Sequence, residues 1–430
     1  MKRKRVLTVT VGAVAVALLA ASCGSKSSST TTAAPETTAA AAETTAAPET
    51  TAAATETTAA ATETTAAAPA VGGAPLKVDT AACTAPAAGT KVKLQLQWFT
   101  QAQFGGYFAA VDQGFYKEVG LDVSILEGGV DIVPQKVLAD GQADFAVSWV
   151  PKSLQSREAG ANITNIAQVF QRSGTLQVSL KDKNITDSAA FKGQKIGNWG
   201  FGNEYEIFAA LSKAGLDPAK DVTLVQQNFD MKGLLDGSID AAEAMIYNEY
   251  AQVLEAKNPA TGALYTPADL NVVSYEKEGV GMLQDAIWAD QAKLADPVYC
   301  GTAIAFVKAS LEGWAFCRDN ADKCRDIVVS KGSKLGASHQ LWQMNEVNGL
   351  VWPAANGVGA IDPAAWERTA SISLNTKNLD GATVLTKAVT DGAWTNDIVA
   401  AALELLKAEG IDVNGSSWAP ATVTLTEGGA

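Results

Sequence analysis

Polar and apolar residues alternate in the first part of the segment from Lys91 to Leu126. A period of two predicts a β-strand, and the alternating apolar positions are Val92, Leu94, Leu96 and Trp98. After a turn rich in aromatic and amide residues, apolar side chains recur at helical spacing from Phe104 to Phe115, and a second apolar run covers Leu121 to Leu126. The pattern predicts a strand, a helix and a strand, which together form a βαβ unit.

Two later segments share one arrangement. In Lys136–Trp149 and in Lys232–Tyr247, a short helix ends at Asp-Gly, and an Asp three residues further on begins a buried strand. The first of these helices opens at Pro134, a residue favoured at the first helical position. The repetition predicts two similarly built α/β lobes rather than one extended sheet.

We expect the chain to cross between the lobes twice. The segment Phe170–Ser179 would carry it into the second lobe, and a return crossing would lie near Tyr275 to Ile287. Lobe one then comprises residues 76–179 and 288–430, and lobe two comprises residues 180–287. The chain after the return crossing is mainly helical covering, at residues 296–307, 311–329, 335–350 and 398–408. Two crossings form a hinge, so we expect the cleft to close on a ligand.

The N-terminal residues have the layout of a secretory signal. Four cations, Lys2 to Arg5, precede an apolar run from Val6 to Ala20, which is short for a bilayer-spanning helix. Small residues before Cys23 resemble a lipobox, although Ala20 stands where Leu is usual. We therefore expect residues 1–23 to be a lipoprotein signal peptide ending at Cys23, the lipidation site, with a soluble secreted protein as the alternative.

Residues 24–75 are almost wholly Ser, Thr, Ala, Glu and Pro. Glutamates recur every six or seven residues, but the intervening Ala and Thr offer no apolar seam for a coiled coil. Such a segment cannot bury a core, so it is predicted to be a disordered tether that holds a folded domain away from a membrane or cell wall.

The net charge is −13, and residues 1–75 contribute none of it because their five Lys or Arg balance five Glu. An acidic surface argues against binding to nucleic acid. It also disfavours capture of anionic ligands by a general field, although a local cation such as Arg172 could still hold one.

Four cysteines remain once Cys23 is assigned to lipid, and they can pair in three ways in an oxidising compartment. One way closes the short segment between Cys317 and Cys324 and leaves Cys83 to pair with Cys300; free thiols are the alternative. The chain has one histidine and no CxxC sequence, so no metal site is expected.

Strand ends in both predicted lobes finish in aromatic and amide residues. Because open α/β sheets bind ligands beyond the carboxyl ends of their strands, a flat heteroaromatic ring stacked between indoles fits these positions. For any single Trp, core packing is the alternative, and for Glu204 and Asn203 it is an ordinary helix cap. Arg172 could instead pair with a nearby glutamate. The predicted ligand-binding residues are Trp98, Gln101, Gln103, Tyr107, Trp149, Arg172, Trp199, Asn203, Glu204, Tyr247 and Asn248.

Three stretches, LQWFTQAQFGGYFAA, QGFYKEVGLDV and DGQADFAVSW, resemble solute-binding proteins of ABC importers. The resemblance covers about residues 91–400 and is to the family that binds thiamine pyrimidine precursors and riboflavin. It implies a type II periplasmic-binding-protein fold, an extracytoplasmic location, a permease and an ATPase as partners, and no cofactor. QVFQRSGT together with NWGFGNEYE is most similar to the riboflavin-binding branch.

Three other classes of function compete with this one: a pyrimidine synthase, a binding protein for sulfonates or nitrate, and an adhesin. A fungal branch of the same family makes the thiamine pyrimidine, but it relies on an active-site histidine and a cysteine-rich stretch, whereas the only histidine here is His339 and the cysteines are scattered. Paired carboxylates such as Glu243 and Glu249 could in principle transfer protons. Sister families bind sulfonates or nitrate in pockets of Ser, Thr and backbone N–H groups, which the Trp, Gln and Asn content here does not match. An adhesin would leave the aromatic strand ends without a purpose.

Overall fold

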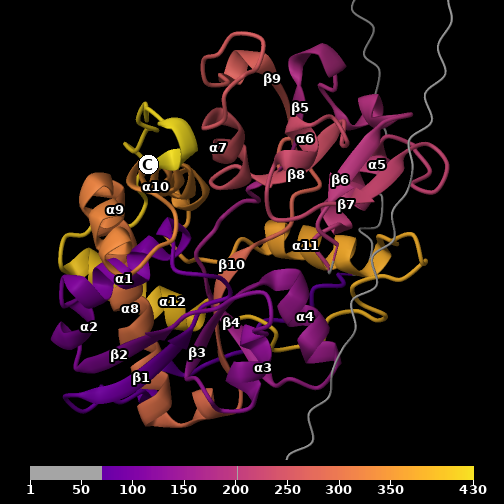
Figure 1. Cartoon of the computed structure of the whole chain (residues 1–430). Coiled ribbons are helices and arrows are strands. Elements are labelled where there is room, and N and C mark those ends of the chain that lie inside the picture. Colours follow the sequence, from indigo (N-terminus) through magenta and orange to yellow (C-terminus); the bar gives the residue numbers. More distant parts are fainter. Residues whose placement is uncertain (1–69, 201) are drawn as a thin grey trace, which may run out of the picture. The chain divides into compact units, whose positions relative to one another are not determined.

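The computed structural model describes residues 70–200 and 202–430. The expected signal peptide, the lipidation site Cys23 and residues 24–69 of the expected tether lie outside the described residues. The described strands form two five-stranded sheets, one in each lobe (Figure 1). Across residues 70–200 and 202–430, no helix has both the length and the apolar character needed to cross a bilayer.

The first sheet has the order β2-β1-β3-β10-β4. Val92 and Leu94 of β1 are buried, as the period of two predicts. The strand β1 pairs in parallel with β2 and β3, whereas β10 runs antiparallel to both of its neighbours. The strands of this sheet are β1 (Thr90–Gln95), β2 (Leu121–Leu126), β3 (Phe145–Trp149), β4 (Ile163–Gln168) and β10 (Asp285–Asp290).

The second sheet repeats this plan with the order β7-β6-β8-β5-β9. Here β6 pairs in parallel with β7 and β8, and β5 is the antiparallel strand. Each lobe therefore receives one antiparallel strand, β5 or β10, directly after a crossing. The strands are β5 (Thr175–Leu180), β6 (Lys195–Asn198), β7 (Thr223–Gln226), β8 (Ala241–Met245) and β9 (Leu270–Ser274).

The structure corrects the predicted lobe boundaries by a few residues. Residues 175–179, which were assigned to the end of lobe one, belong to β5 of the second sheet, and residues 285–287, assigned to lobe two, begin β10 of the first. The crossings are therefore residues 169–174 and 275–284. Both strands pair only with partners distant in sequence, so no local pattern marks where each crossing ends.

The repeated Asp-Gly arrangement has the same role in each lobe. The carboxylate of Asp144 accepts a hydrogen bond of 2.8 Å from the backbone N–H of Lys93, and that of Asp240 accepts one of 2.9 Å from the N–H of Lys195. Each aspartate thus joins the start of the central strand that follows it to the neighbouring parallel strand, β1 or β6. The prediction of two similarly built lobes is confirmed.

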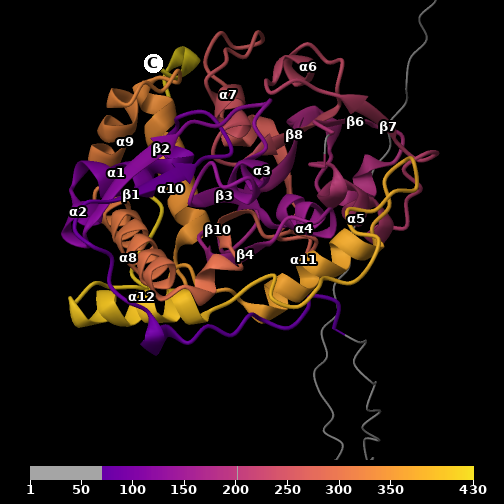
Figure 2. The ribbon, with the colours of Figure 1, turned by 90° about the horizontal axis from the view of Figure 1, so that it is seen from below.

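Helices cover both faces of each sheet. Beside the first sheet, α8 and α12 run along one side, while α3 and α4 pack against the other (Figure 2). In the second lobe, α5 shares a buried cluster with Phe191 and Ile196, and α6 and α7 share one with Leu176 and Val178. The helices of the first lobe are α1 (Gly105–Asp112), α2 (Phe115–Glu118), α3 (Pro134–Ala139), α4 (Val150–Glu158), α8 (Pro297–Asp319), α9 (Ala321–Ser330) and α12 (Asp397–Ala408), and those of the second are α5 (Tyr205–Lys213), α6 (Lys232–Leu235) and α7 (Glu249–Leu254).

Two further helices contact both lobes. The helix α10 (Ala337–Val351) packs against α8 and α9 of the first lobe and against α7 of the second. The helix α11 (Pro363–Asn375), which the sequence pattern did not predict, packs against α4 and α5. Figure 1 shows α11 between the two sheets. Relative movement of the lobes must therefore shift their contacts with α10 and α11.

The N-terminal end of the described chain is held against the first lobe. The Glu367 carboxylate accepts hydrogen bonds from the N–H groups of Val71 and Gly72, and the N–H of Leu76 donates to the carbonyl of Trp394 at 2.7 Å. Val71 and Gly72 thus already make contacts with the folded chain, so the predicted tether boundary at residue 75 is too late.

The four cysteines outside the signal segment form two disulfides. Cys83 pairs with Cys300 at the start of α8, and Cys317 pairs with Cys324 where α8 passes into α9. The Cα atoms are 5.3 and 5.4 Å apart, within the usual range for a bridge. This is the pairing that closes the short 317–324 segment, one of the three that the sequence allowed.

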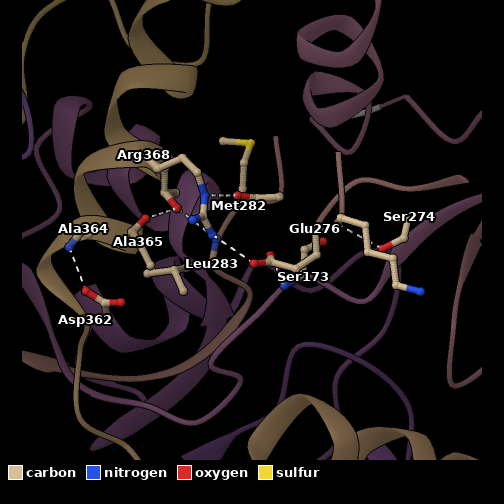
Figure 3. Close-up of polar contacts among 12 residues, drawn as sticks. Ser173, Ser274, Glu276, Met282, Leu283, Asp362, Ala364, Ala365 and Arg368 are labelled. Carbon is tan, nitrogen blue, oxygen red and sulfur yellow. Dashed lines mark hydrogen bonds and ion pairs between the residues drawn. The ribbon is translucent and has the colours of Figure 1, made fainter. Parts of the chain in front are cut away.

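A polar cluster joins the two crossings to α11 (Figure 3). Glu276 of the return crossing accepts a hydrogen bond of 3.0 Å from the N–H of Ser173 in the first crossing. Its other oxygen lies 3.3 Å from a guanidinium nitrogen of Arg368, which also donates to the carbonyl of Gly281 at 2.9 Å. These contacts tie the two crossings to each other and to α11.

Candidate ligand-binding site

A cavity of about 640 Å³ lies between the two lobes. This volume falls within the range of known ligand pockets. The first lobe contributes the loop after β1, the loop leading into α3 and the junction of β3 with α4. The second lobe contributes the loops after β6 and β7 and the end of β8. The lining residues are Gln97, Trp98, Gln101, Gln103, Gly129 to Gln135, Ser148, Trp149, Lys152, Gln155, Ser156, Trp199, Asn203, Phe229, Met245 and Tyr247 to Glu249.

Aromatic side chains from both lobes meet at this cavity. The rings of Trp98 in lobe one and Phe229 in lobe two have centroids 5.1 Å apart, in an edge-to-face arrangement. Phe229 also stacks on Trp199, with centroids 6.1 Å apart and planes inclined by 29°. The indole of Trp149 lines the cavity from the junction of β3 and α4. Such rings offer large flat surfaces on which another ring can stack.

The apolar lining includes side chains that remain open to solvent. Val130, Val133 and Phe229 are 63%, 52% and 43% exposed, although each is a large apolar residue. The first two lie in the loop leading into α3, and Phe229 lies in the loop after β7. Exposed apolar surface at a cavity is typical of sites that bind an apolar group.

Asp285 holds several polar side chains of the first lobe in place. Its carboxylate accepts hydrogen bonds from the side-chain amides of Gln97 and Gln103, the latter at 3.0 Å, and from the indole N–H of Trp149 at 2.8 Å. Asp285 is 2% exposed, and this burial raises the pKa of its carboxyl to about 7. Asp285 therefore lies behind the wall and positions residues that line the cavity.

Two glutamates of the second lobe hold backbone groups near the cavity in place. The carboxylate of Glu243 accepts a 2.7 Å hydrogen bond from the N–H of Trp199, and that of Glu249 accepts one of 2.9 Å from the N–H of Met245. Burial raises the pKa of both carboxyls above its ordinary value. These carboxyls thus brace the loop after β6 and the end of β8.

A buried histidine links the cavity to α10. The Nε2 atom of His339 lies 3.0 Å from the side-chain oxygen of Asn248, and its Nδ1 atom lies 2.8 Å from Glu255. Asn248 lines the cavity and also donates to Glu249 at 2.8 Å. The only histidine of the chain therefore orients an amide of the site from behind.

Eight of the eleven predicted ligand-binding residues line the cavity: Trp98, Gln101, Gln103, Trp149, Trp199, Asn203, Tyr247 and Asn248. Three do not. Tyr107 is 1% exposed and packs edge-to-face on Trp314 in the core, because its face of α1 is turned toward α8. Arg172 donates to the carbonyls of Gly349, Trp352 and Pro353 at the end of α10.

Glu204 is the third correction. Its carboxylate turns back to accept a hydrogen bond of 2.9 Å from the N–H of Gly202 in the same loop. It is the N-cap residue of α5 but makes no side-chain cap hydrogen bond. Neither Arg172 nor Glu204 is among the residues that line the cavity.

Sequence reasoning missed other residues that line the cavity, among them Phe229, Lys152 and Gln97, and it missed the supporting Asp285. Phe229 lies in a loop without periodicity, and Lys152 lies in the first turn of α4, so neither follows a strand end directly. Asp285 and Gln97 meet across 188 residues of sequence, and no local pattern signals such a contact. An exposed aromatic residue in a loop after a strand is the one signal that could have indicated Phe229.

The described residues contain no group of three His, Cys, Asp or Glu side chains that could hold a metal ion. The site instead combines aromatic faces with amide and hydroxyl groups. Such a set can stack a ring and satisfy its hydrogen-bond donors and acceptors.

Two α/β lobes joined by two crossings, with a lined cavity between them, define the class of periplasmic-binding-protein folds. The periplasmic aliphatic sulphonate-binding protein SsuA of Escherichia coli has this fold with a TM-score of 0.50, 13% identity, and coverage of 78% of this chain and 94% of that one. The family model described as NMT1/THI5-like matches residues 101–324, so the chain belongs to the NMT1/THI5-like family.

Relatives in this family have different named activities. The formylaminopyrimidine-binding protein of Halalkalibacterium halodurans is 20% identical over 241 residues, which cover 56% of this chain and 70% of that protein. The 4-amino-5-hydroxymethyl-2-methylpyrimidine phosphate synthase THI13 of Saccharomyces cerevisiae is 28% identical over 153 residues, 35% of this chain and 45% of the enzyme. The chain thus spans between about half and seven tenths of the curated relatives it matches.

Proposed function

We propose that this protein is the extracytoplasmic solute-binding component of an ABC importer. In this proposal it captures a heteroaromatic vitamin or vitamin precursor, riboflavin or a thiamine-type pyrimidine, in the cavity between its lobes and releases it unchanged to a permease. A signal peptide over residues 1–23, lipid on Cys23 and the tether after it would hold the protein at the outer face of the cell membrane.

The observation that carries the proposal is the set of aromatic side chains that both lobes contribute to the cavity. Trp98 and Trp149 come from lobe one, Trp199 and Phe229 come from lobe two, and amide side chains line the same cavity. A flat ring held by both halves gains contacts with each lobe only when the cleft is closed, which couples binding to hinge movement. The formylaminopyrimidine-binding relative supports a heteroaromatic ligand, and the two disulfides fit an oxidising compartment.

Binding without catalysis is preferred over a synthase activity because the histidine and cysteine side chains, on which the synthase branch relies, lie outside the cavity lining. His339 is 1% exposed and held between Asn248 and Glu255, outside the residues that line the cavity. The cysteines of the described chain are paired in disulfides. The groups left at the cavity suit recognition of a ring.

The test is equilibrium binding of two ring compounds to the full chain. Riboflavin is titrated by quenching of its fluorescence and 4-amino-5-hydroxymethyl-2-methylpyrimidine by calorimetry, and the compound is recovered afterwards. We expect one of them to bind at a 1:1 ratio with a Kd of about 1 μM or below and to be recovered unchanged. Trp149→Ala with Trp199→Ala should weaken binding, while Trp418→Ala, outside the cavity, should not. Binding of neither ring, or conversion of either one, would overturn the proposal.

A further inference from the structure

One cation lines the cavity with an indole ring beneath it but no anionic partner among the described residues. Lys152 lies in the first turn of α4, three residues after Trp149, and its ammonium nitrogen is 5.1 Å from the centre of that indole ring. No carboxylate of residues 70–200 or 202–430 comes within ion-pair distance of it, and no described acceptor is hydrogen-bonded to it. By contrast, the buried Lys308 has Glu312 at 2.8 Å and Glu409 at 2.7 Å.

From this arrangement we infer that the ligand is a heteroaromatic ring bearing an oxyanion, a carboxylate or phosphate group, and that Lys152 binds that oxyanion. The inference rests on the proposed function and narrows its class of ligand. A lone cation at the wall of a largely apolar cavity is costly to desolvate, and an anionic partner removes that cost. Its position beside Trp149 lets one ligand stack its ring on the indole and turn its charged substituent to the ammonium group.

The carboxyl groups nearest to Lys152 do not supply the missing partner. Asp285 and Glu243 are buried behind the cavity wall and are engaged by other N–H donors, and burial favours their neutral forms by raising both pKa values. Glu204 is engaged with the N–H of Gly202. Desolvation lowers the pKa of Lys152 itself, as expected for an ammonium group without a close counter-ion.

The face of α4 that carries Lys152 is polar where it meets the cavity. Gln155 and Ser156 follow Lys152 by three and four residues, so the three share one side of the helix, and all of them line the cavity. The amide and the hydroxyl can add hydrogen bonds to an oxyanion held by the ammonium group. Because the chain as a whole is acidic, recognition of an anion has to come from such a local group.

The experiment compares neutral and anionic forms of the same ring. Calorimetry measures the Kd of the full chain for riboflavin and flavin mononucleotide, and for the 2-methyl-4-aminopyrimidine bearing hydroxymethyl, carboxylate or phosphate at position 5. We expect at least one anionic compound to bind about 10- to 100-fold more tightly than its neutral parent, the effect of one charge-assisted contact. Preference for the phosphate or for the carboxylate identifies the oxyanion.

Substitutions then assign that preference to one residue. Lys152→Met should lower affinity for the anionic compound to that of the neutral parent, and Lys152→Arg, which keeps the charge, should retain most of the preference. Lys136→Met, on α3 of the same lobe, removes an exposed cation paired with Asp140 and should change nothing. A thermal midpoint for each variant confirms that it is folded.

The outcomes separate this inference from the proposed function. Equal affinity for neutral and anionic rings, or an equal loss for both in Lys152→Met, would overturn the inference while the proposed function stands. Failure of the wild-type protein to bind any of the five compounds would overturn both.

Discussion

Replacing Asp285 with Asn tests how the buried carboxyl group controls the pH dependence of the protein's stability. Asn has nearly the same shape as Asp but cannot ionise. In the wild-type protein, burial raises the pKa of this carboxyl from 3.8 to about 7, although three N–H donors favour the ionised form. The folded chain therefore holds a proton that the unfolded chain releases between these two pH values.

The size of the effect follows from linkage. Because the folded state binds more protons in this window, the free energy of unfolding falls as the pH rises through it, by up to about 1.4 kcal/mol per pH unit. Between about pH 5 and pH 8, Asp285 alone should account for a fall of about 3 kcal/mol. The stabilisation is fully present below pH 3.8 and is lost as the pH passes the folded-state pKa of about 7.

Urea unfolding at a series of pH values, followed by tryptophan fluorescence and circular dichroism, measures this dependence. We expect the free energy of unfolding of the wild-type protein to fall more steeply with pH than that of Asp285→Asn, with the two curves differing by about 3 kcal/mol over the range. Asp122→Asn, at an exposed position of β2, should follow the wild-type curve. Parallel curves for the wild-type protein and Asp285→Asn would refute the reasoning.

Three further predictions concern an aromatic residue of the cavity, the ion pair that joins the return crossing to α11, and a disulfide. Trp199→Ala should weaken binding of the preferred ring compound about 5- to 100-fold in calorimetry, because stacking on an aromatic side chain contributes about 1–3 kcal/mol; unchanged affinity would remove Trp199 from the site. Glu276→Gln and Arg368→Gln should each lower stability by up to about 1 kcal/mol, since the pair is partly exposed, and a double-mutant cycle by chemical unfolding should give a coupling energy that is not zero. Replacing Cys83 and Cys300 with Ser should lower the free energy of unfolding by about 2–5 kcal/mol, because the bridge closes a long loop; an unaltered unfolding midpoint would contradict this.

Much of the fold could be predicted because its signals are local. The period of two around Val92, the helical spacing after Phe104 and the repeated Asp-Gly turns each depend on a few neighbouring residues. These patterns give the βαβ unit and the two similar lobes. The sequence instead predicts residues 175–179 of β5 as part of the crossing, because the partners of this strand, β8 and β9, lie far along the chain.

The candidate site likewise contains residues that local patterns predict and residues whose roles depend on contacts distant in sequence. Trp149 and Trp199 could be placed at the cavity because strand ends of an α/β sheet gather at one edge. Arg172 could not, because the competing partners are carbonyl groups near the end of α10, about 180 residues away, which lack partners within the helix. Asp285 was missed for the same reason, since its role appears only when Gln97 and Trp149 are brought to it by folding.

Mass spectrometry of what the protein carries tests the central claim most directly. The full chain is purified from cells without added ligand and denatured, and the released small molecules are measured relative to protein. The account predicts one aromatic heterocycle, in a molar ratio approaching one, that is lost when Trp149 and Trp199 are both replaced with Ala. Release of an aliphatic sulfonate instead, or an aromatic compound retained equally by the double variant, would contradict it.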